Sequence, residues 1–216
     1  MRLKAVLFDF DGVLADTENH HIAAWQRTLS VLGWQVADDV AARSTEIDDR
    51  EFLSELFAGR GLPTDKVEDW VRRKQMLTVQ LLRHSPRLYP GVVDLVGRLR
   101  GKARLAVVSG TWRENIRVVL EAAGLTGSFE TIIGKEDVIS VKPDPEAYVL
   151  ALRRLRLTAR KAVALEDSPS GVASARAAGI PVIAVGHRRR FGDWVSDATY
   201  ISGFEPVVGL LEHLGF

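Results

Sequence analysis

The stretch Val6-Leu7-Phe8-Asp9-Phe10-Asp11-Gly12-Val13-Leu14 decides how this chain is organised. An apolar run leads into two aspartates separated by one residue, and a glycine follows at once. Such a run is typical of a buried strand, and Gly12 marks the point where the backbone turns away from it. Asp9 and Asp11 are then expected at the carboxyl end of the strand, where open α/β sheets bind their ligands.

The two aspartates are like charges close together, so another group has to compensate them. The simplest compensators are a divalent cation or a lysine. The alternative is a pair of solvated turn residues, because a single D-x-D-G is a weak motif. Residues at i and i+2 share a face only in a regular strand. Convergence of Asp9 and Asp11 therefore requires the chain to leave strand geometry near Gly12.

The composition indicates an ordinary globular protein. The chain has 216 residues, of which 46% are hydrophobic and 26% charged, and its formal net charge is +1. The charge gives no sign of a nucleic-acid surface. The absence of cysteine excludes disulfides, thiolate metal sites and a cysteine nucleophile. We find no signal sequence and no apolar run of the roughly 20 residues that a membrane helix needs. We therefore expect a cytoplasmic protein without a nucleic-acid or membrane partner, and a monomer is the default expectation.

The chain changes character near residue 89. Before it, helical patterns follow the first strand with no strand pattern between them, at Ala15–Gly33, Val36–Arg60 and Pro63–His84. The second of these is broken and polar around Ser44–Arg50. After it, strands alternate with helices. The expected strands are Arg104–Ser109, Phe129–Ile133, Ala162–Leu165, Pro181–Val185 and a short Thr199–Ile201. The expected helices are Val92–Arg100, Glu114–Ala123, Pro145–Arg156, Pro169–Ala178 and Pro206–Leu214.

This alternation predicts a parallel sheet with right-handed crossovers, and the apolar strands predict that both of its faces are covered. We expect the α/β class, with a Rossmann-like three-layer core formed by residues 1–15 and 89–216. Residues 16–88 are expected to form an inserted all-helical cap domain. Two linkers join the parts, which allows the cap to act as a lid over the strand ends.

Carboxylates follow the first and the fourth expected strand of this sheet. Asp9 and Asp11 follow the first, and Glu166-Asp167 ends the fourth. Because all parallel strands end at one edge of the sheet, these side chains are expected to converge. Mg²⁺ prefers a few carboxylates, with waters and phosphate oxygens completing its octahedron. Asp9 and Asp167 are the candidate ligands, with Glu166 outside them.

Groups suited to phosphate are expected at the same edge. The Ser109 hydroxyl and the Gly110 amide can bind phosphate, aided by the start of the following helix. Lys142, which precedes Pro143, can place a positive charge between a phosphate and a carboxylate. Phosphoryl transfer needs such positioning and charge neutralisation, and a carboxylate can be its nucleophile.

The motifs D-F-D-G-V-L-A-D-T, V-V-S-G, V-K-P-D-P and L-E-D-S-P-S-G, in this order, resemble those of the haloacid dehalogenase superfamily. Together with Tyr89-Pro90-Gly91, they resemble its subgroup with a small helical cap, which includes β-phosphoglucomutase and phosphoglycolate phosphatase. The resemblance covers essentially the whole chain. It implies a Mg²⁺-dependent enzyme that acts on a small phosphorylated metabolite.

The resemblance also implies roles for single residues. Asp9 would be the nucleophile. Asp11 would be the acid and base, and would give its backbone carbonyl to the metal. Lys142 would be catalytic and, with Ser109, would hold the phosphate. Asp167 would bind Mg²⁺, and Glu166 would orient the metal shell.

Candidate substrate contacts lie outside these motifs. His21 aligns with a histidine found in β-phosphoglucomutase-like chains, and Thr17 is placed to line the hinge. Arg43 lies in the polar part of the cap, and Arg113 follows Ser109 by one helical turn. A solvated or structural role is the alternative for each of them. The basic run His187–Arg190 is more simply explained as a solvated loop.

Three functions follow in order of preference. The first is a phosphatase that hydrolyses a sugar phosphate or related metabolite through an aspartyl-phosphate. The second is a β-phosphoglucomutase-like mutase, which needs a second phosphate site. The resemblance implies a basic residue pair near a glycine in the cap of such a mutase, whereas the corresponding stretch Thr45–Arg50 is acidic and lacks glycine, which disfavours this function. The third is a non-catalytic protein that binds a phosphorylated metabolite. Such a protein would be expected to lack one of the motif residues, but all of these are present: Asp9, Asp11, Lys142 and Asp167.

Overall fold

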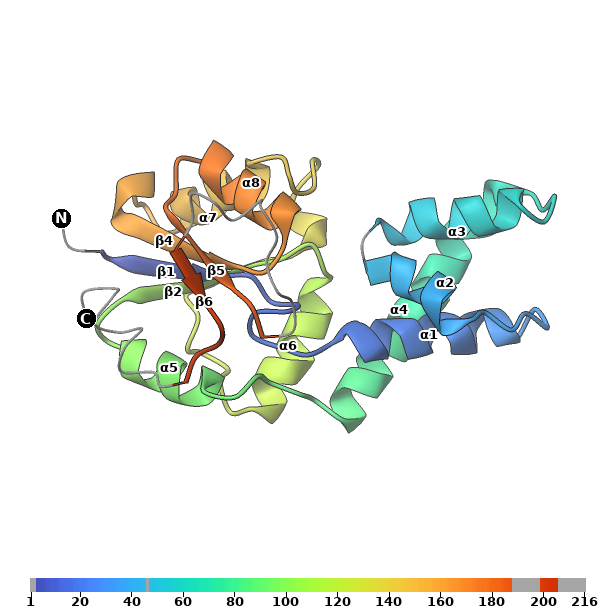
Figure 1. The fold of residues 1–216 in the computed structure, drawn as a ribbon, viewed down its shortest axis with the longest axis horizontal. Coiled ribbons are helices and arrows are strands. Elements are labelled where there is room, and N and C mark those ends of the chain that lie inside the picture. The colour runs from blue at the N-terminus through green and yellow to red at the C-terminus, as the bar shows by residue number, and fades with distance from the viewer. Residues whose placement is uncertain (1–2, 46, 188–198, 206–216) are drawn as a thin grey trace. The chain divides into compact units, whose positions relative to one another are not determined.

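The computed structural model describes residues 3–45, 47–187 and 199–205, and the chain divides into two compact units (Figure 1). One unit, here called the core unit, comprises Met1–Asp16 and Arg87–Phe216. The other, the helical unit, comprises Thr17–Pro86. The boundaries expected from the sequence, after residues 15 and 88, lie within two residues of these.

The core unit is built on a parallel sheet. Its described strands are β1 (Ala5–Phe8), β2 (Arg104–Val108), β3 (Thr131–Ile133), β4 (Ala162–Glu166), β5 (Val182–Val185) and β6 (Thr199–Ile201). They pair in the order β3-β2-β1-β4-β5-β6, and every pair is parallel. The central strand β1 is buried along its whole length. The order reverses on either side of β1, which places a topological switch point at its carboxyl end.

Helices cover both faces of this sheet. They are α5 (Val92–Leu99), α6 (Arg113–Ala122), α7 (Glu146–Arg154) and α8 (Pro169–Ala177), with short 3-10 turns at Lys135–Asp137 and Ala159–Lys161. Figure 1 shows α7 and α8 on one side of the sheet and α5 and α6 on the other. Ala5 and Leu7 of β1 pack in the same cluster as Tyr148 and Ala151 of α7. The predicted α/β class with a Rossmann-like core is confirmed.

The helical unit contains α1 (Glu18–Ser30), α2 (Asp38–Ala42), α3 (Asp49–Ala58) and α4 (Val67–His84), with 3-10 turns at Arg43–Thr45 and Thr64–Lys66. Its core is largely aromatic and aliphatic. Trp25 of α1 lies against Phe52 of α3, with ring centroids 5.3 Å apart. Leu29, Leu53 and Val71 fill the same cluster. The four helices thus have a hydrophobic core of their own.

Two expectations lie outside the described residues: the helix at Pro206–Leu214, and the basic run beyond His187. Within the described part, no helix combines the length and the apolar character that a bilayer crossing requires.

Candidate active site

The first strand ends immediately before the two aspartates. β1 stops at Phe8, although the backbone N–H of Asp9 still donates to the carbonyl of Leu165 at 2.9 Å. The chain then closes a tight loop, in which the Gly12 N–H donates to the Ala15 carbonyl at 2.9 Å. Asp9 and Asp11 therefore do not belong to one regular strand, and strand alternation does not govern their side chains.

Gly12 is needed in this loop for two reasons. Its φ of +83° lies in the left-handed region that other residues avoid. A Cβ atom at this position would also lie 1.9 Å from Oδ2 of Asp167. The absence of a side chain therefore lets Asp167 approach the loop that carries the two aspartates.

Lys142 contacts three acceptors at the centre of the site. Its Nζ donates to Oδ1 of Asp9 at 2.7 Å, to Oε1 of Glu166 at 2.6 Å and to the Val108 carbonyl at 3.0 Å. All three ammonium hydrogens thus have acceptors. Burial lowers the pKa of Lys142, but the charges of Asp9 and Glu166 outweigh burial and hold this pKa above its ordinary value. The lysine therefore stays charged and compensates the buried carboxylates.

Glu166 ends β4 and is completely buried. Its Oε1 accepts from Lys142 and also from the Tyr148 hydroxyl, at 2.5 Å. Burial raises the pKa of Glu166 to about 7, although the Lys142 charge opposes this shift. Burial and the negative charge of Glu166 also raise the pKa of Tyr148 well above its ordinary value, so the hydroxyl keeps its proton.

Tyr148 was not among the residues predicted from the sequence. It lies on the inward face of α7, where its spacing indicates only a core position. A buried tyrosine usually needs a hydrogen-bond partner for its hydroxyl. That requirement was the one sequence signal that could have pointed to a polar neighbour.

Gly171 makes room for the Glu166 carboxylate. A Cβ atom on Gly171 would lie 1.9 Å from Oε2 of Glu166. Gly171 belongs to the first turn of α8, where its N–H donates to the capping Ser168 hydroxyl at 3.1 Å. Oε2 of Glu166 has no hydrogen-bond partner among the described residues. The carboxylate is thus packed against the start of α8, which favours negative charge.

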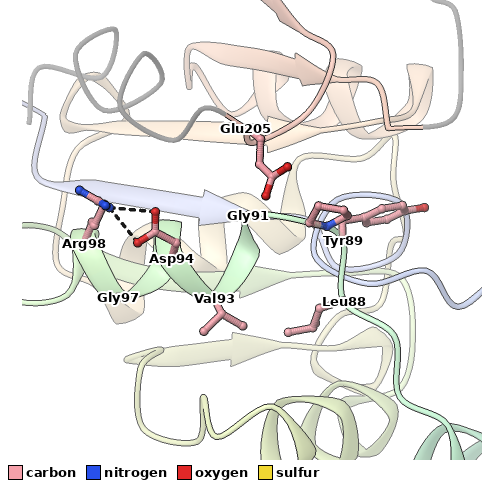
Figure 2. A pocket seen from close by; sticks show the side chains of 9 residues that line it. Leu88, Tyr89, Gly91, Val93, Asp94, Gly97, Arg98 and Glu205 are labelled. Carbon is pink, nitrogen blue, oxygen red and sulfur yellow. Dashed lines mark hydrogen bonds and ion pairs between the residues drawn. The ribbon is translucent and has the colours of Figure 1, made fainter.

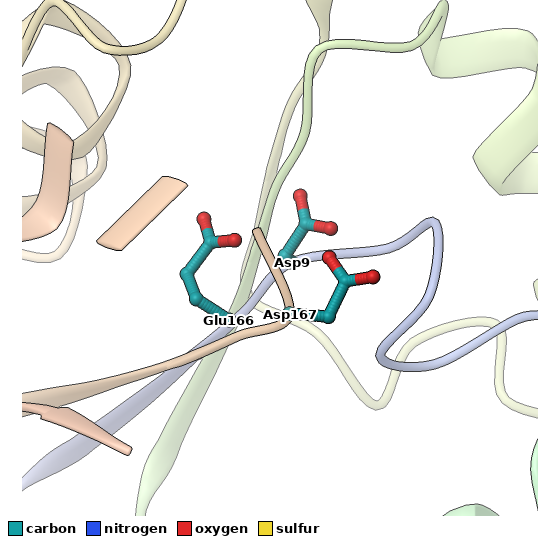
Figure 3. A group of neighbouring side chains, drawn as sticks. All are labelled: Asp9, Glu166 and Asp167. Carbon is teal, nitrogen blue, oxygen red and sulfur yellow. The ribbon is translucent and has the colours of Figure 1, made fainter. Parts of the chain in front are cut away.

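Three carboxylates form a candidate metal centre. Asp9, Glu166 and Asp167 each offer an oxygen, and these oxygens lie within 4.8 Å of one another (Figure 3). A set of carboxylate oxygens suits a hard divalent cation such as Mg²⁺. Three acidic groups beside one lysine also leave negative charge to be compensated. The residues present therefore fit such an ion.

Ser109 brings the second aspartate into the same site. It follows β2 and is buried, and its hydroxyl lies 3.3 Å from Oδ2 of Asp11. The same hydroxyl accepts from the Thr111 N–H at 3.1 Å. Asn115, also buried, donates to the Thr111 hydroxyl at 3.0 Å. Gly110 is exposed beside this network. Ser109 is thus held by a chain of buried polar groups and lies next to Asp11.

Both arginines predicted to contact substrate have carboxylate partners within their own unit. Arg113 forms an ion pair with Asp137, and its backbone N–H donates to the carboxylate of Glu136. In the helical unit, Arg43 pairs with Glu55 at 2.6 Å, and both side chains are about half exposed. A substrate contact from either arginine would require it to exchange or share this partner.

The other two predicted contacts belong to α1. Thr17 is buried at the N-cap of α1. Nδ1 of His21 lies 3.0 Å from Nζ of Lys74. Lys74 is buried and donates to both oxygens of Asp49, at 2.8 and 3.0 Å, and the Trp25 indole also donates to Asp49. Because an ammonium only donates, Nδ1 of His21 is the acceptor, and Nε2 carries the ring hydrogen.

A hollow elsewhere in the core unit contains none of these groups. It lies beside the start of α5 and is lined by Leu88, Tyr89, Pro90, Val93 and Glu205, among others (Figure 2). Its arginine, Arg98, donates to Asp94 of the same helix at 2.8 Å. The acidic and basic side chains of the candidate site therefore lie at the carboxyl edge of the sheet and not in this hollow.

Fold and site together place acidic and basic groups at the topological switch point of an open α/β sheet, where such sheets bind their ligands. Residues 6–185 match the family model described as haloacid dehalogenase-like hydrolase. The chain belongs to this family, and the predicted family is confirmed.

Relatives of known name extend over nearly the whole chain. The chain is 33% identical to Protein CbbY of Rhodobacter capsulatus, with 93% of this chain and 92% of that protein covered. It is 30% identical to the Phosphorylated carbohydrates phosphatase of Thermotoga maritima, with coverage of 94% and 95%. The crystal structure of CbbY from Rhodobacter sphaeroides in complex with Xylulose-(1,5)bisphosphate is also similar. Its TM-score is 0.83 at 30% identity, over 94% of this chain and 95% of that one.

Proposed function

We propose that this protein is a Mg²⁺-dependent phosphatase that hydrolyses a small phosphomonoester, a sugar phosphate or related metabolite, through an aspartyl-phosphate. The observation that carries the proposal is the contact of Lys142 with Asp9 beside the carboxylates of Glu166 and Asp167. The similarity to a phosphorylated carbohydrates phosphatase and to a sugar bisphosphate complex supports the substrate class.

Asp9 is the proposed nucleophile. Its carboxylate oxygen forms a bond to phosphorus while the bond from phosphorus to the ester oxygen breaks. Asp11 gives its proton to the departing oxygen. In the second step Asp11 takes a proton from water, the water oxygen bonds to phosphorus, and the Asp9–phosphorus bond breaks. Phosphate is released, and both aspartates return to their starting states.

Other residues bind the charged oxygens of the phosphoryl group. Ser109, Gly110 and Lys142 are the proposed donors. Lys142 holds Asp9 in place and shares one of its hydrogens with the phosphoryl oxygens once substrate is bound. Mg²⁺ would be held by Asp9, Asp167 and the Asp11 backbone carbonyl, with Glu166 outside, and would supply positive charge for the phosphoryl oxygens.

The helical unit is proposed to be the cap that selects the substrate. Its proposed contacts with the substrate are Thr17, His21 and Arg43. Arg113 is proposed to contact the substrate from the core unit. His21 is the best prepared of the four, because its Lys74 contact fixes which ring nitrogen donates.

Hydrolysis of an aryl phosphate tests the function. Phosphate release should require Mg²⁺, stop on addition of a chelator and fall to background in Asp9→Asn. Full activity in that variant, or none in the metal-loaded wild type with any of a panel of phosphorylated metabolites, would refute the proposal.

The reaction product distinguishes the runner-up function, a mutase, from the proposed phosphatase. A mutase would convert β-glucose 1-phosphate to glucose 6-phosphate in the presence of a bisphosphate primer. We expect phosphate release in its place. Binding of a phosphorylated metabolite without turnover would indicate the non-catalytic alternative.

A further inference from the structure

One tyrosine contacts both charged partners at the centre of the site. Tyr148 is completely buried in α7, and its hydroxyl donates to Oε1 of Glu166 at 2.5 Å. Its ring also faces the ammonium of Lys142, with Nζ 5.3 Å from the ring centroid. That distance is within the range of a cation–π interaction.

The Glu166 carboxylate is restrained at both of its oxygens. Oε1 accepts from Tyr148 and from Lys142, while Oε2 packs against Gly171, where no Cβ would fit. Glu166 therefore cannot rotate without losing a hydrogen bond or striking the first turn of α8. Its position in turn fixes Lys142, which also holds Asp9.

We propose that Tyr148 is a positioning residue of the phosphoryl-transfer site. It acts through Glu166 and Lys142, which fix the position of the nucleophile relative to the acidic metal centre. The proposal rests on the proposed function. It assigns two separable tasks to one side chain: the hydroxyl orients Glu166, and the ring supports the charge of Lys142.

The test compares Tyr148→Phe, which keeps the ring, with Tyr148→Leu, which removes both groups. Tyr200→Phe is the matched control, because Tyr200 is 46% exposed on the edge strand β6. Three quantities are measured: kcat and KM for an aryl phosphate, and the Kd for Mg²⁺ by calorimetry without substrate. Circular dichroism confirms that each variant is folded.

Residues that hold the groups surrounding a metal site typically contribute about 10- to 100-fold to metal affinity or activity. We expect Tyr148→Phe to lower kcat about 10-fold and weaken Mg²⁺ binding about 10-fold, with KM unchanged within about twofold. Tyr148→Leu should have a lower kcat and weaker Mg²⁺ binding than Tyr148→Phe. Tyr200→Phe should match the wild type. A merely structural role would lower stability without separating kcat from KM.

The results distinguish the two proposals. A folded Tyr148→Phe variant with wild-type kcat and wild-type Mg²⁺ affinity overturns the positioning role and leaves the phosphatase function intact. A wild type without turnover refutes the function, and the Mg²⁺ titration then decides on Tyr148 by itself. If Tyr148→Leu does not fold, Tyr148→Phe carries the test alone.

Discussion

The Nζ atom of Lys142 lies 2.7 Å from Oδ1 of Asp9, although the two residues are 133 positions apart in the sequence. The same atom lies 2.6 Å from Oε1 of Glu166. One buried cation thus allows the carboxylates of Asp9, which follows β1, and of Glu166, which ends β4, to share the edge of the sheet. Without it, their repulsion and desolvation would oppose the fold at this point.

Replacement of Lys142 by methionine tests this relationship. We expect Lys142→Met to lower kcat/KM about 100- to 1,000-fold, the usual cost of removing one preorganised donor to a developing charge. Lys102→Met is the control, because Lys102 is exposed in a turn of the same unit. Steady-state kinetics with an aryl phosphate measure both variants. Activity of Lys142→Met within tenfold of the wild type would exclude the assigned role.

Gly12 and Gly127 form a matched pair of glycines. Both have a φ of +83°, but a Cβ atom on Gly127 would meet nothing within 4 Å, whereas one on Gly12 would strike Asp167. Each alanine variant should lose about 1 kcal/mol or more to left-handed strain. Only Gly12→Ala should also weaken Mg²⁺ binding, measured by calorimetry. Equal Mg²⁺ affinity in the two variants would show that the close approach of Asp167 is not needed.

Lys74 and Asp49 form a buried ion pair inside the helical unit, with side chains 1% and 10% exposed. Lys74→Met leaves Asp49 without its cation and should cost about 3–5 kcal/mol of unfolding free energy. The double variant Lys74→Met with Asp49→Leu should recover part of that loss, because no charge is then left unpaired. Urea unfolding followed by circular dichroism measures both, with exposed Lys66→Met as the control. A double variant no more stable than the single one would contradict the prediction.

His187 should make stability depend on pH. Its ring stacks on Tyr89, with centroids 4.0 Å apart, and meets Phe204 edge-on. Burial lowers the pKa of His187 below its ordinary value of 6.5, although a hydrogen bond to the Val13 backbone opposes the shift. Below pH 6.5 the unfolded chain therefore binds a proton at His187 more readily than the folded chain does. The contribution of His187 to stability is therefore complete above pH 6.5 and is lost as the pH falls below it.

His187→Phe keeps an aromatic ring that cannot titrate. The difference in unfolding free energy between wild type and variant should shift against the wild type as the pH falls from about 7.5 to about 5.5. Urea unfolding at both pH values measures this difference. A difference that is constant with pH would mean that the folded and unfolded chains bind the His187 proton equally well.

The sequence was sufficient for the fold because its strands are short apolar runs with clear ends. Arg104–Ser109 and Ala162–Leu165 each stop at a polar group, and the observed strands β2 and β4 end within one residue of those predictions. The alternation with helices left a parallel sheet as the natural arrangement. The strand order and the pairing register could not be predicted in this way, because the apolar strands resemble one another and do not indicate which of them pair.

The site was harder to predict where a residue's role depends on its partner. Asp9 and Lys142 stood out by motif, but Tyr148 and Lys74 did not. Tyr148 has the spacing of an ordinary core residue, and Lys74 is a charge that sequence patterns assign to the surface. Each becomes important only through a distant carboxylate, Glu166 or Asp49. Likewise, the ion pair of Arg113 with Asp137 depends on a partner that local spacing does not reveal.

Detection of the covalent intermediate tests the central claim most directly. The protein is mixed with Mg²⁺ and an aryl phosphate, quenched in acid during turnover, digested and analysed by mass spectrometry. We predict one phosphoryl group on the peptide that contains Asp9, and none on that peptide from Asp9→Asn. Turnover by the wild type with no phosphoryl group on Asp9, confirmed across quench times, would contradict the account.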